Sequence, residues 1–324
     1  ATPLPTPPPD GPAAPVETDS QRPRDEGVGL VVQPSSDPPA IAEPVEVTVY
    51  GDKGPPGAVS LGRRQIREMP GVLGDPYRAI EVEPGVIPAA SGVPYYFLRG
   101  APPGNVGYFF DGIEVPLLFH VGAGPSVIPP GLVERVELHM GPYPVTYGRF
   151  AGAIVEAESV APRDDLRAEG AFRGVDLGGL VEVPLPAGAG SVLLGGHYAV
   201  GAEVLSALVD SIDLGYWDYQ GRLSVRAGQD ARLTVTTFGA YDYLAAVDGD
   251  AVDVLLDSDF RRLDTRYDKD LPGGGKLRTG VTLGLDQSRG AGVDRVRNLK
   301  WGARALVEHP VSSRLRVRFG LDAT

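Results

Sequence analysis

The 324-residue sequence lacks cysteine altogether and has no apolar run long enough for a transmembrane helix. The first absence excludes disulfides, thiol catalysis and cysteine-ligated metal centres. The second excludes a helical membrane span, which needs about 18 apolar residues, but not spans made of strands, whose apolar residues alternate with polar ones. Basic side chains are also few, 30 against 42 acidic ones, and the net charge of −12 argues against a nucleic-acid-binding face.

Patterns that carry catalysis or metal binding are missing too. No GxSxG serine motif occurs, and the glycines at 273–275 lack the Ser or Thr that a phosphate-binding loop needs after its lysine. The acidic segment 248–259 lacks the closing glutamate of a calcium loop, so we interpret it as a solvated loop. The four histidines have neither HxxH nor HExxH spacing: His120, His139, His197 and His309. The sequence therefore predicts no enzyme activity, no metal site and no cofactor.

Proline is abundant at the start of the chain, where residues 1–44 hold 12 of the 32 prolines. We expect an extended, disordered linker there, because the stretch has too few bulky apolar residues to offset its ordering entropy. The alternative is a proline-rich ligand for another domain. Residues 45–51 that follow are a short β-former run. They suit strand addition to a partner's sheet edge, or alternatively an edge strand of the next domain.

Residues 52–160 predict a small mixed α/β domain. Ser60 can cap a helix over residues 61–68, and Asp75 can cap a second short helix with proline at its first position. Strands follow. Asp111 and Gly112 lie between two β-rich triplets and predict a hairpin with a type I′ turn.

From about residue 166 onward, segments of about ten residues alternate polar and apolar. The clearest is 314–319, with three arginines on one face and three apolar residues on the other. This pattern suits a wall with lipid or a core on one side and water on the other. Five aromatics lie near the predicted segment ends, where interface aromatics would lie: Trp217, Tyr219, Tyr241, Tyr243 and Trp301.

Between residues 46 and 159 the sequence resembles the plug domain of TonB-dependent outer-membrane receptors. Short motifs occur in the family's order, and their residues are Arg99, Gly100, Asp111, Gly112, Arg135, Glu137, Gly141, Pro142, Tyr147, Gly148 and Gly152. One departure is Glu156, where the family often has asparagine. The segment that looks like the TonB box comprises Glu46, Val47, Thr48, Val49 and Tyr50.

The resemblance implies a fold, namely an α+β plug domain at 52–160 followed by antiparallel transmembrane β-barrel strands at 161–324. At about 20 residues per strand and connection, the second region holds about 8 strands, against about 22 in plugged barrels. The chain also stops within a strand pattern. We therefore expect the N-terminal part of a longer receptor, or one chain of a split barrel.

Roles for individual side chains also follow from the resemblance. Arg135 and Glu137 are expected to pair with charges on the barrel wall, or alternatively to lie on a solvent-exposed strand face. For Arg99, a plug–barrel ion pair is favoured over a charge near the substrate mouth. The plug apices would be 101–107 and 117–127, and the candidate substrate contacts are Phe119 and His120.

The implied function is energised uptake of a substrate across the bacterial outer membrane. The partners would be TonB, which would bind the periplasmic N-terminal segment, outer-membrane lipid, and a small-molecule, metal-complex or glycan substrate. An alternative is a plugged-barrel surface receptor or adhesin that signals or exports protein without import. A soluble β-rich enzyme or carbohydrate-binding module is disfavoured by the order of the plug motifs and the missing catalytic cluster.

Overall fold

The computed structural model describes residues 58–72, 74–90, 93–141, 143–172, 176–202, 206, 209, 211–290, 292–312 and 314–324. The predicted linker (1–44), the TonB-box-like segment (45–51) and Pro142 lie outside the described residues. In the ranges described, no helix has both the length and the apolar character to cross a membrane.

The predicted plug contains a five-stranded sheet with strand order β1-β6-β7-β4-β5 and a separate two-stranded pair, β2-β3. Its strands are β1 (Ala58–Gly62), β2 (Val86–Ala90), β3 (Val93–Leu98), β4 (Val106–Phe110), β5 (Ile113–Glu114), β6 (Val133–His139) and β7 (Ala153–Ser159). Its helix is α1 (Arg63–Glu68), and its 3-10 turns are η1 (Arg78–Val82), η2 (Pro103–Asn105), η3 (His120–Gly122), η4 (Pro130–Leu132) and η5 (Val145–Tyr147). Only β4 and β7 pair in parallel within these sheets as described. The mixed α/β domain is therefore confirmed.

The hairpin predicted at Asp111 and Gly112 is confirmed. Phe110 pairs with Ile113 across a two-residue turn, in which Asp111 has φ 51° and Gly112 has φ 80°. Both positive angles are those of a type I′ turn. The Asp111 carboxylate accepts the backbone N–H of Ser159 at 2.9 Å and its hydroxyl at 2.7 Å. The turn is thereby fixed to the end of β7.

The first helix begins later than the sequence predicts. Ser60 and Leu61 belong to β1, which pairs with β6, and α1 begins at Arg63. The cap is also different, because the Gln65 side chain accepts the backbone N–H of Gly62 at 2.9 Å. Leu61 is buried in the core. Pairing and burial of this strand therefore override the local capping signal of Ser60.

Asp75 caps the second helical segment as predicted, although the segment is the 3-10 turn η1. Its Oδ1 accepts the backbone N–H groups of Tyr77 at 3.0 Å and Arg78 at 3.3 Å. Its Oδ2 accepts the N–H of Ser126 at 2.8 Å. One buried carboxylate thus joins η1 to the loop that precedes η4.

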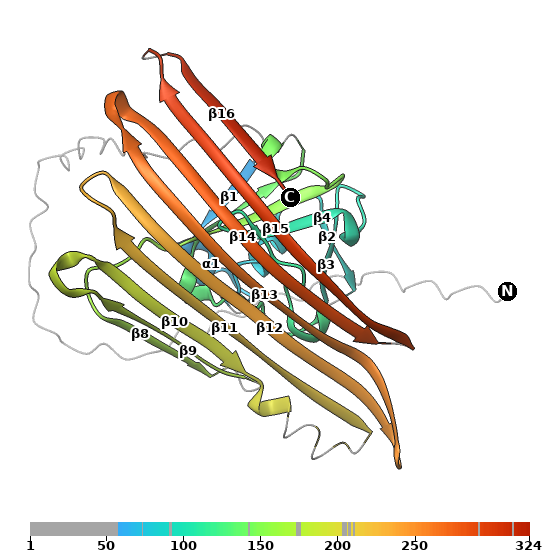
Figure 1. The fold of residues 1–324 in the computed structure, drawn as a ribbon. Helices are drawn as coiled ribbons and strands as arrows, with labels where there is room; N and C mark the ends of the chain where they lie inside the picture. Colours follow the sequence, from blue (N-terminus) through green and yellow to red (C-terminus); the bar gives the residue numbers. More distant parts are fainter. Residues whose placement is uncertain are drawn as a thin grey trace, which may run out of the picture. The chain divides into compact units, whose positions relative to one another are not determined.

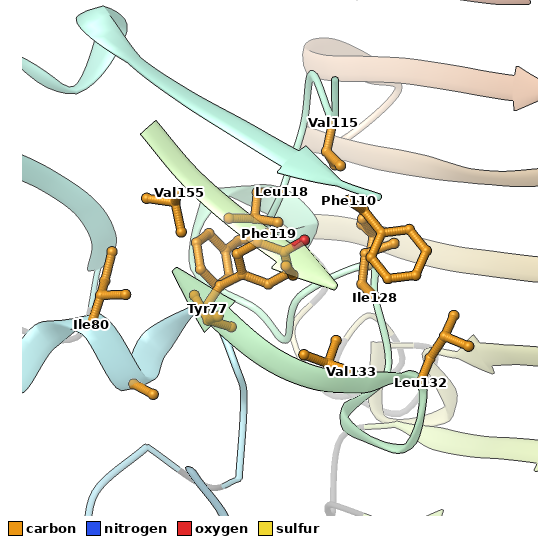
Figure 2. Close-up of a cluster of buried hydrophobic side chains, with 14 of the residues drawn as sticks. Tyr77, Ile80, Phe110, Val115, Leu118, Phe119, Ile128, Leu132, Val133 and Val155 are labelled. Atoms are coloured by element: carbon orange, nitrogen blue, oxygen red, sulfur yellow. The ribbon is translucent and has the colours of Figure 1, made fainter. Parts of the chain in front are cut away.

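The apolar core of the predicted plug lies around these turns and the five-stranded sheet. Figure 2 shows Tyr77, Phe110, Phe119 and Ile128 within this cluster, and each is at most 2% exposed. The Tyr77 hydroxyl donates to the carbonyl oxygen of Phe109 at 3.0 Å, so its polar end is satisfied inside the core.

The rest of the described chain forms one antiparallel sheet of nine strands, ordered β16 to β8, which we call the wall sheet. Figure 1 shows its strands side by side in chain order. They are β8 (Arg167–Phe172), β9 (Leu177–Pro184), β10 (Gly190–Tyr198), β11 (Ile212–Arg226), β12 (Ala231–Asp248), β13 (Ala251–Leu271), β14 (Gly275–Gly290), β15 (Val293–Pro310) and β16 (Arg316–Ala323). Two further 3-10 turns, η6 (Pro186–Gly188) and η7 (Pro272–Gly274), connect neighbouring strands. The prediction of about eight strands is close to these nine.

The middle of β11 buries its polar side chains and leaves neighbouring apolar ones exposed. On β11, Asp218, Gln220 and Arg222 are each at most 5% exposed. On either side of this set, Trp217 is 39% and Leu223 is 41% exposed. This polar-in, apolar-out alternation is the pattern of a strand with a polar interior on one side and lipid on the other. It confirms the alternation read from the sequence.

Two expectations for the wall sheet are wrong. The acidic segment 248–259 is not a loop: Asp248 pairs with Ala251, and β13 begins at once. Trp217 and Trp301 lie inside their strands rather than near the ends, because β11 and β15 are 15 and 18 residues long. The alternating pattern identified parts of these strands and missed their extensions.

Candidate functional site: the interface between plug and wall sheet

Three groups of polar side chains join the predicted plug to the buried face of the wall sheet. They are centred on His120, Arg222 and Arg262. In each group, a charged side chain on a long strand binds a backbone or side-chain group of the plug.

His120 bridges two neighbouring strands of the wall sheet. Its Nδ1 lies 2.9 Å from Oδ1 of Asp242 on β12, and its Nε2 lies 2.9 Å from Oδ2 of Asp218 on β11. All three side chains have no exposed surface. The ring also stacks on Tyr216, with centroids 4.4 Å apart. Residues 117–127, which we call the 117–127 loop, are therefore tied to the wall sheet by charge-assisted hydrogen bonds.

A second histidine and an amide extend this network. His197 Nδ1 lies 2.8 Å from Oδ2 of Asp218, and the His197 backbone N–H donates to Oδ1 at 3.1 Å. The Gln220 amide donates to Oδ1 of Asp218 and to the carbonyl oxygen of Val127, both at 2.7 Å. The far end of the 117–127 loop is thus held to the same carboxylate.

The residue after His120 has an unusual backbone conformation. Val121 has φ 50°, which is rare for a β-branched side chain. Its N–H donates to Oδ1 of Asp242 at 2.8 Å. The carboxylate that binds the His120 ring therefore also holds this strained turn in place.

The environment of His120 favours its charged form. Burial alone would lower the pKa of His120, because it penalises the charged ring. The hydrogen bonds to Asp218 and Asp242, with their negative charges, outweigh burial and raise the pKa to about 9. The ring is therefore protonated at neutral pH.

Arg222 holds the segment in which the plug runs into the wall sheet. Its Nη1 donates to the carbonyl oxygen of Val160 and, at 3.2 Å, to the hydroxyl of Ser159. Its Nη2 donates to Oε1 of Glu182 at 3.1 Å. Glu182 is fully buried and also accepts the Ser191 hydroxyl at 2.7 Å. This group contains a paired cation and anion with several further hydrogen bonds.

The third group docks the β4–β5 hairpin. Arg262 Nε donates to the carbonyl oxygen of Glu114 at 3.1 Å, and Arg262 Nη1 donates to Asp286. Lys300 Nζ lies 3.2 Å from the Glu114 carboxylate and 3.3 Å from Asp286. The Lys300 and Glu114 side chains are both about two-fifths exposed, so this pair is screened by water.

The expected pairing of Arg135 and Glu137 with the wall sheet is not what the structure shows. Arg135 forms ion pairs with Glu158 at 2.8 Å and Glu137 at 3.5 Å, both within the plug. Glu137 also lies 3.4 Å from Nε2 of His139. The register pairs Arg135 with Glu158 across β6 and β7, so this carboxylate is directly opposite.

Arg99 and Gly100 form the turn after β3. Both have positive φ, 49° and 86°, and both are exposed. The Arg99 N–H donates to the carbonyl oxygen of Gly85 at 2.9 Å. Within the part of the chain that the structure describes, Arg99 forms no ion pair, so the favoured plug–barrel pair is absent there. Gly141 lies nearby, since a Cβ on it would be 3.9 Å from Arg99 Nη1.

The remaining plug-motif residues support the backbone around β7. Tyr147 packs on Phe109, with ring centroids 4.8 Å apart, and Gly148 ends η5. The Gly152 N–H donates to the carbonyl oxygen of Asn105 at 3.0 Å. A Cβ on Gly152 would lie 2.8 Å from that oxygen, so only glycine fits.

Glu156 is a buried carboxyl group with few hydrogen bonds to compensate for its burial. Its Oε1 accepts the Gly112 N–H at 2.8 Å, whereas its buried Oε2 has no hydrogen-bond partner among the described residues. Burial and then the charge of Asp111 raise the pKa of Glu156 to about 8. A protonated Glu156 can donate as well as accept, as an asparagine amide can.

The two predicted substrate contacts are buried. Phe119 is 2% exposed and lies in the core below the Arg78 guanidinium, 5.5 Å from the ring centroid. His120 is inside the interface described above. Because neither side chain reaches a surface in this structure, a contact with substrate stays a prediction for both.

Sequence reasoning missed the acidic partners of His120 and Arg222, namely Asp218, Asp242 and Glu182. Polar residues at every second position of an apolar strand do indicate an inward face. They do not indicate which plug residue each one meets. Across the described ranges, no group of three or more His, Asp or Glu side chains is arranged to hold a metal ion.

A family model described as the TonB-dependent receptor plug domain matches residues 53–155. No curated protein matches the sequence. Among solved structures, the fold is similar to a ferric enterobactin receptor mutant, PfeA, from Pseudomonas aeruginosa (TM-score 0.59, 14% identity, covering 82% of this chain and 48% of that chain). It is similar to the siderophore receptor PirA from Acinetobacter baumannii (TM-score 0.61, 15% identity, covering 82% of this chain and 47% of that chain). It is also similar to the alcaligin outer-membrane receptor FauA from Bordetella pertussis (TM-score 0.59, 17% identity, covering 83% of this chain and 46% of that chain).

The chain thus spans about half the length of these receptors. At these identities the structures establish the fold, and the family model identifies the first domain. The chain therefore carries the plug domain of a TonB-dependent receptor at residues 53–155, followed by antiparallel strands with the fold of part of such a receptor's β-barrel.

Proposed function

We propose that the chain acts in a TonB-dependent outer-membrane receptor that takes up a substrate by energised transport. The observation that carries this proposal is the buried polar interface between plug and wall sheet. Its hydrogen bonds at His120, Arg222 and Arg262 hold the plug against the inner face of the strands. A path through such an interior requires breaking some of these contacts, which explains a need for an external source of energy.

The proposal assigns a part to each region. Residues 1–44 form a spacer, and residues 45–51 bind TonB by strand addition on the periplasmic side. Residues 52–160 are the plug, and residues 161–324 contribute barrel strands in contact with outer-membrane lipid. The exposed apolar side chains of the wall sheet, such as Leu263 at 44% and Leu299 at 77%, support this lipid contact.

The substrate class to test first is an iron–siderophore complex. The similar structures include a siderophore receptor, a ferric enterobactin receptor in complex with enterobactin, and an alcaligin receptor. The described ranges hold no metal cluster of their own, so the iron would arrive as part of the substrate. Ferric enterobactin and ferric alcaligin, labelled with radioactive iron, are suitable probes.

Deletion of residues 46–50 tests the transport reaction. The full chain is expressed in outer membranes, and ligand binding, accumulation and cross-linking to TonB through Val45→Cys, which the deletion retains, are measured separately. We expect the deletion to abolish accumulation and to leave binding unchanged, and a protonophore to have the same effect on the intact protein. A reordered 46–50 sequence of the same composition is the control for spacer length.

Two outcomes contradict the proposal. If the deletion changes neither accumulation nor the TonB cross-link at Val45→Cys, residues 46–50 are not the coupling segment. If ligand binds without any protonophore-sensitive accumulation, the alternative of a surface receptor or adhesin that signals or exports protein is favoured instead.

A further inference from the structure

The geometry around His120 favours a ring that is protonated on both nitrogens. Both ring nitrogens lie 2.9 Å from carboxylate oxygens, one on Asp218 and one on Asp242. An ionised carboxylate can only accept hydrogen bonds, so each nitrogen must donate. A neutral imidazole has one donor, whereas the imidazolium has two. His120 therefore binds the wall sheet as a cation.

The groups that face this cation come from five elements. On β11 and β12 they are the two carboxylates, with Tyr216 stacked on the ring. On β10, His197 donates to the same Asp218 carboxylate. On β3, Tyr95 packs beside the loop, where a Cβ on Gly122 would lie 3.4 Å from its ring, and burial followed by the charge of Asp242 raises its pKa. On η1, the Arg78 guanidinium donates to the carbonyl oxygen of Ala123 at 2.7 Å.

We propose that His120 is a proton-dependent latch, which holds the 117–127 loop to β11 and β12 while its ring is protonated and releases the loop when the proton is lost. Losing the proton removes one of the two donors. A nitrogen lone pair then faces a buried carboxylate oxygen at hydrogen-bond distance, and two acceptors repel each other. The latch adds a regulatory step to the proposed function. It rests on that function only for its purpose, which is to keep the interior closed.

The backbone next to His120 favours opening once the proton is gone. Val121 keeps its positive φ while Asp242 accepts its N–H. Such a conformation is strained for a β-branched residue and persists only where its surroundings enforce it. When the ring and Asp242 separate, the backbone is free to leave this conformation. The strain thus opposes the charge attraction and makes the latch reversible.

Direct observation of the ring is the first test. The full chain, labelled with ¹⁵N-histidine in lipid, has four histidines, which His→Gln variants assign one at a time. We expect both His120 nitrogens to carry protons at pH 7.5, and one to lose its proton with a midpoint near pH 9. A His120 ring with a single proton at pH 7.5 would overturn the proposal. This measurement needs neither TonB nor a substrate.

Loop motion is the second test. Because the chain lacks cysteine, a nitroxide can be placed on Ala123→Cys alone, at an exposed position of the 117–127 loop. We expect an immobilised spectrum at pH 7 and a mobile component that grows through pH 9. A label on Asp165→Cys, an exposed residue between β7 and β8, should show no such change. His120→Gln should give the mobile spectrum at both pH values, and His309→Gln should behave as the parent does.

A pH-independent Ala123→Cys spectrum that His120→Gln also leaves unchanged would overturn the latch. If His120→Gln does not fold, the ¹⁵N titration of the unmodified protein still decides. The uptake experiments above have separate readouts. Loss of uptake on deleting residues 46–50 would stand without a latch, and the latch would stand in a receptor that does not import.

Discussion

The plug is held to the wall sheet by two buried anchors of different chemistry, one at Arg222 and one at His120. A guanidinium cannot lose its proton in a protein, so the Arg222 anchor is a permanent charge. It grips Val160, where the plug continues into the strands. An imidazolium can lose its proton, and His120 grips the 117–127 loop. The end of the plug that continues into the strands is therefore bound by a charge that does not titrate. The 117–127 loop is bound by a charge that is lost when His120 is deprotonated.

Removing the permanent anchor should have the largest effect. Arg222→Met leaves the Glu182 carboxylate buried without its counter-charge, and we expect a loss of roughly 3–5 kcal/mol in the free energy of unfolding. Denaturant unfolding of the full chain in lipid vesicles measures it. Arg226→Met on the same strand is the matched control, because its pair with Asp164 is at least half exposed. Equal losses in the two variants would contradict the anchor role of Arg222.

Removing the titratable anchor should cost less and depend on pH. The pKa of His120 is raised from 6.5 to about 9, which corresponds to on the order of 3 kcal/mol. Because the folded value is the higher one, this stabilisation is fully present below pH 6.5 and is lost as the pH rises through about 9. The unfolding free energies of the parent and His120→Gln should therefore converge above that pH. A difference in unfolding free energy between the parent and His120→Gln that stays constant from pH 6 to 10 would contradict this prediction. His309→Gln is the control.

Glu156, a buried carboxyl group without a counter-charge in the part of the chain that the structure describes, provides a third case for the comparison. The pKa of Glu156 is raised to about 8, so its folded form is destabilised progressively as the pH rises from 4.5 to 8. Glu156→Gln should equal the parent at pH 4 and exceed it by roughly 1–3 kcal/mol at pH 8.5. Glu158→Gln, on the same strand and 45% exposed, should show no gain. The measurement is the same unfolding curve at both pH values.

The smallest effect is expected at the exposed pair of the third group. Lys300→Met removes the contact with Glu114, in which both side chains are about two-fifths exposed. Such pairs contribute roughly 0–1 kcal/mol, and salt screens them. We expect Lys300→Met to lower the free energy of unfolding by less than about 1 kcal/mol, and we expect this loss to vanish in high salt. A loss comparable with that of Arg222→Met would mean that exposure does not separate the anchors.

Local features of the fold could be predicted from the sequence because their causes are local. Asp111-Gly112 specifies its own turn, Asp75 caps the residues that follow it, and alternation on β11 reflects the two faces of one strand. The start of the first helix was predicted wrongly from Ser60, because β1 pairs with β6, a segment about 75 residues away. Such pairing outweighs a helix cap, which contributes roughly 1 kcal/mol. The alternation at 314–319 gave a strand but not its partner.

The interface could not be predicted for the same reason. His120 meets Asp218 and Asp242 across 98 and 122 residues of chain. No spacing rule connects such residues, and one histidine in a loop has no signature of its own. The plug motifs identified the domain because their glycines serve local turns and close approaches, such as Gly152 against Asn105. The contacts that the structure describes for Arg135 and Arg99 lie within the plug instead of at the wall sheet, where the resemblance had placed them.

The length of the β12–β13 hairpin has a practical consequence. At about 3.3 Å per residue, the 21 residues of β13 extend much further than the 9–11 residues that a tilted strand needs to cross a bilayer. We therefore expect the turn at Gly249 and Asp250, an exposed two-residue tip, to stand clear of the lipid. A short epitope inserted there should be accepted without loss of folding, and it would let an antibody report on intact cells which side of the membrane this hairpin faces.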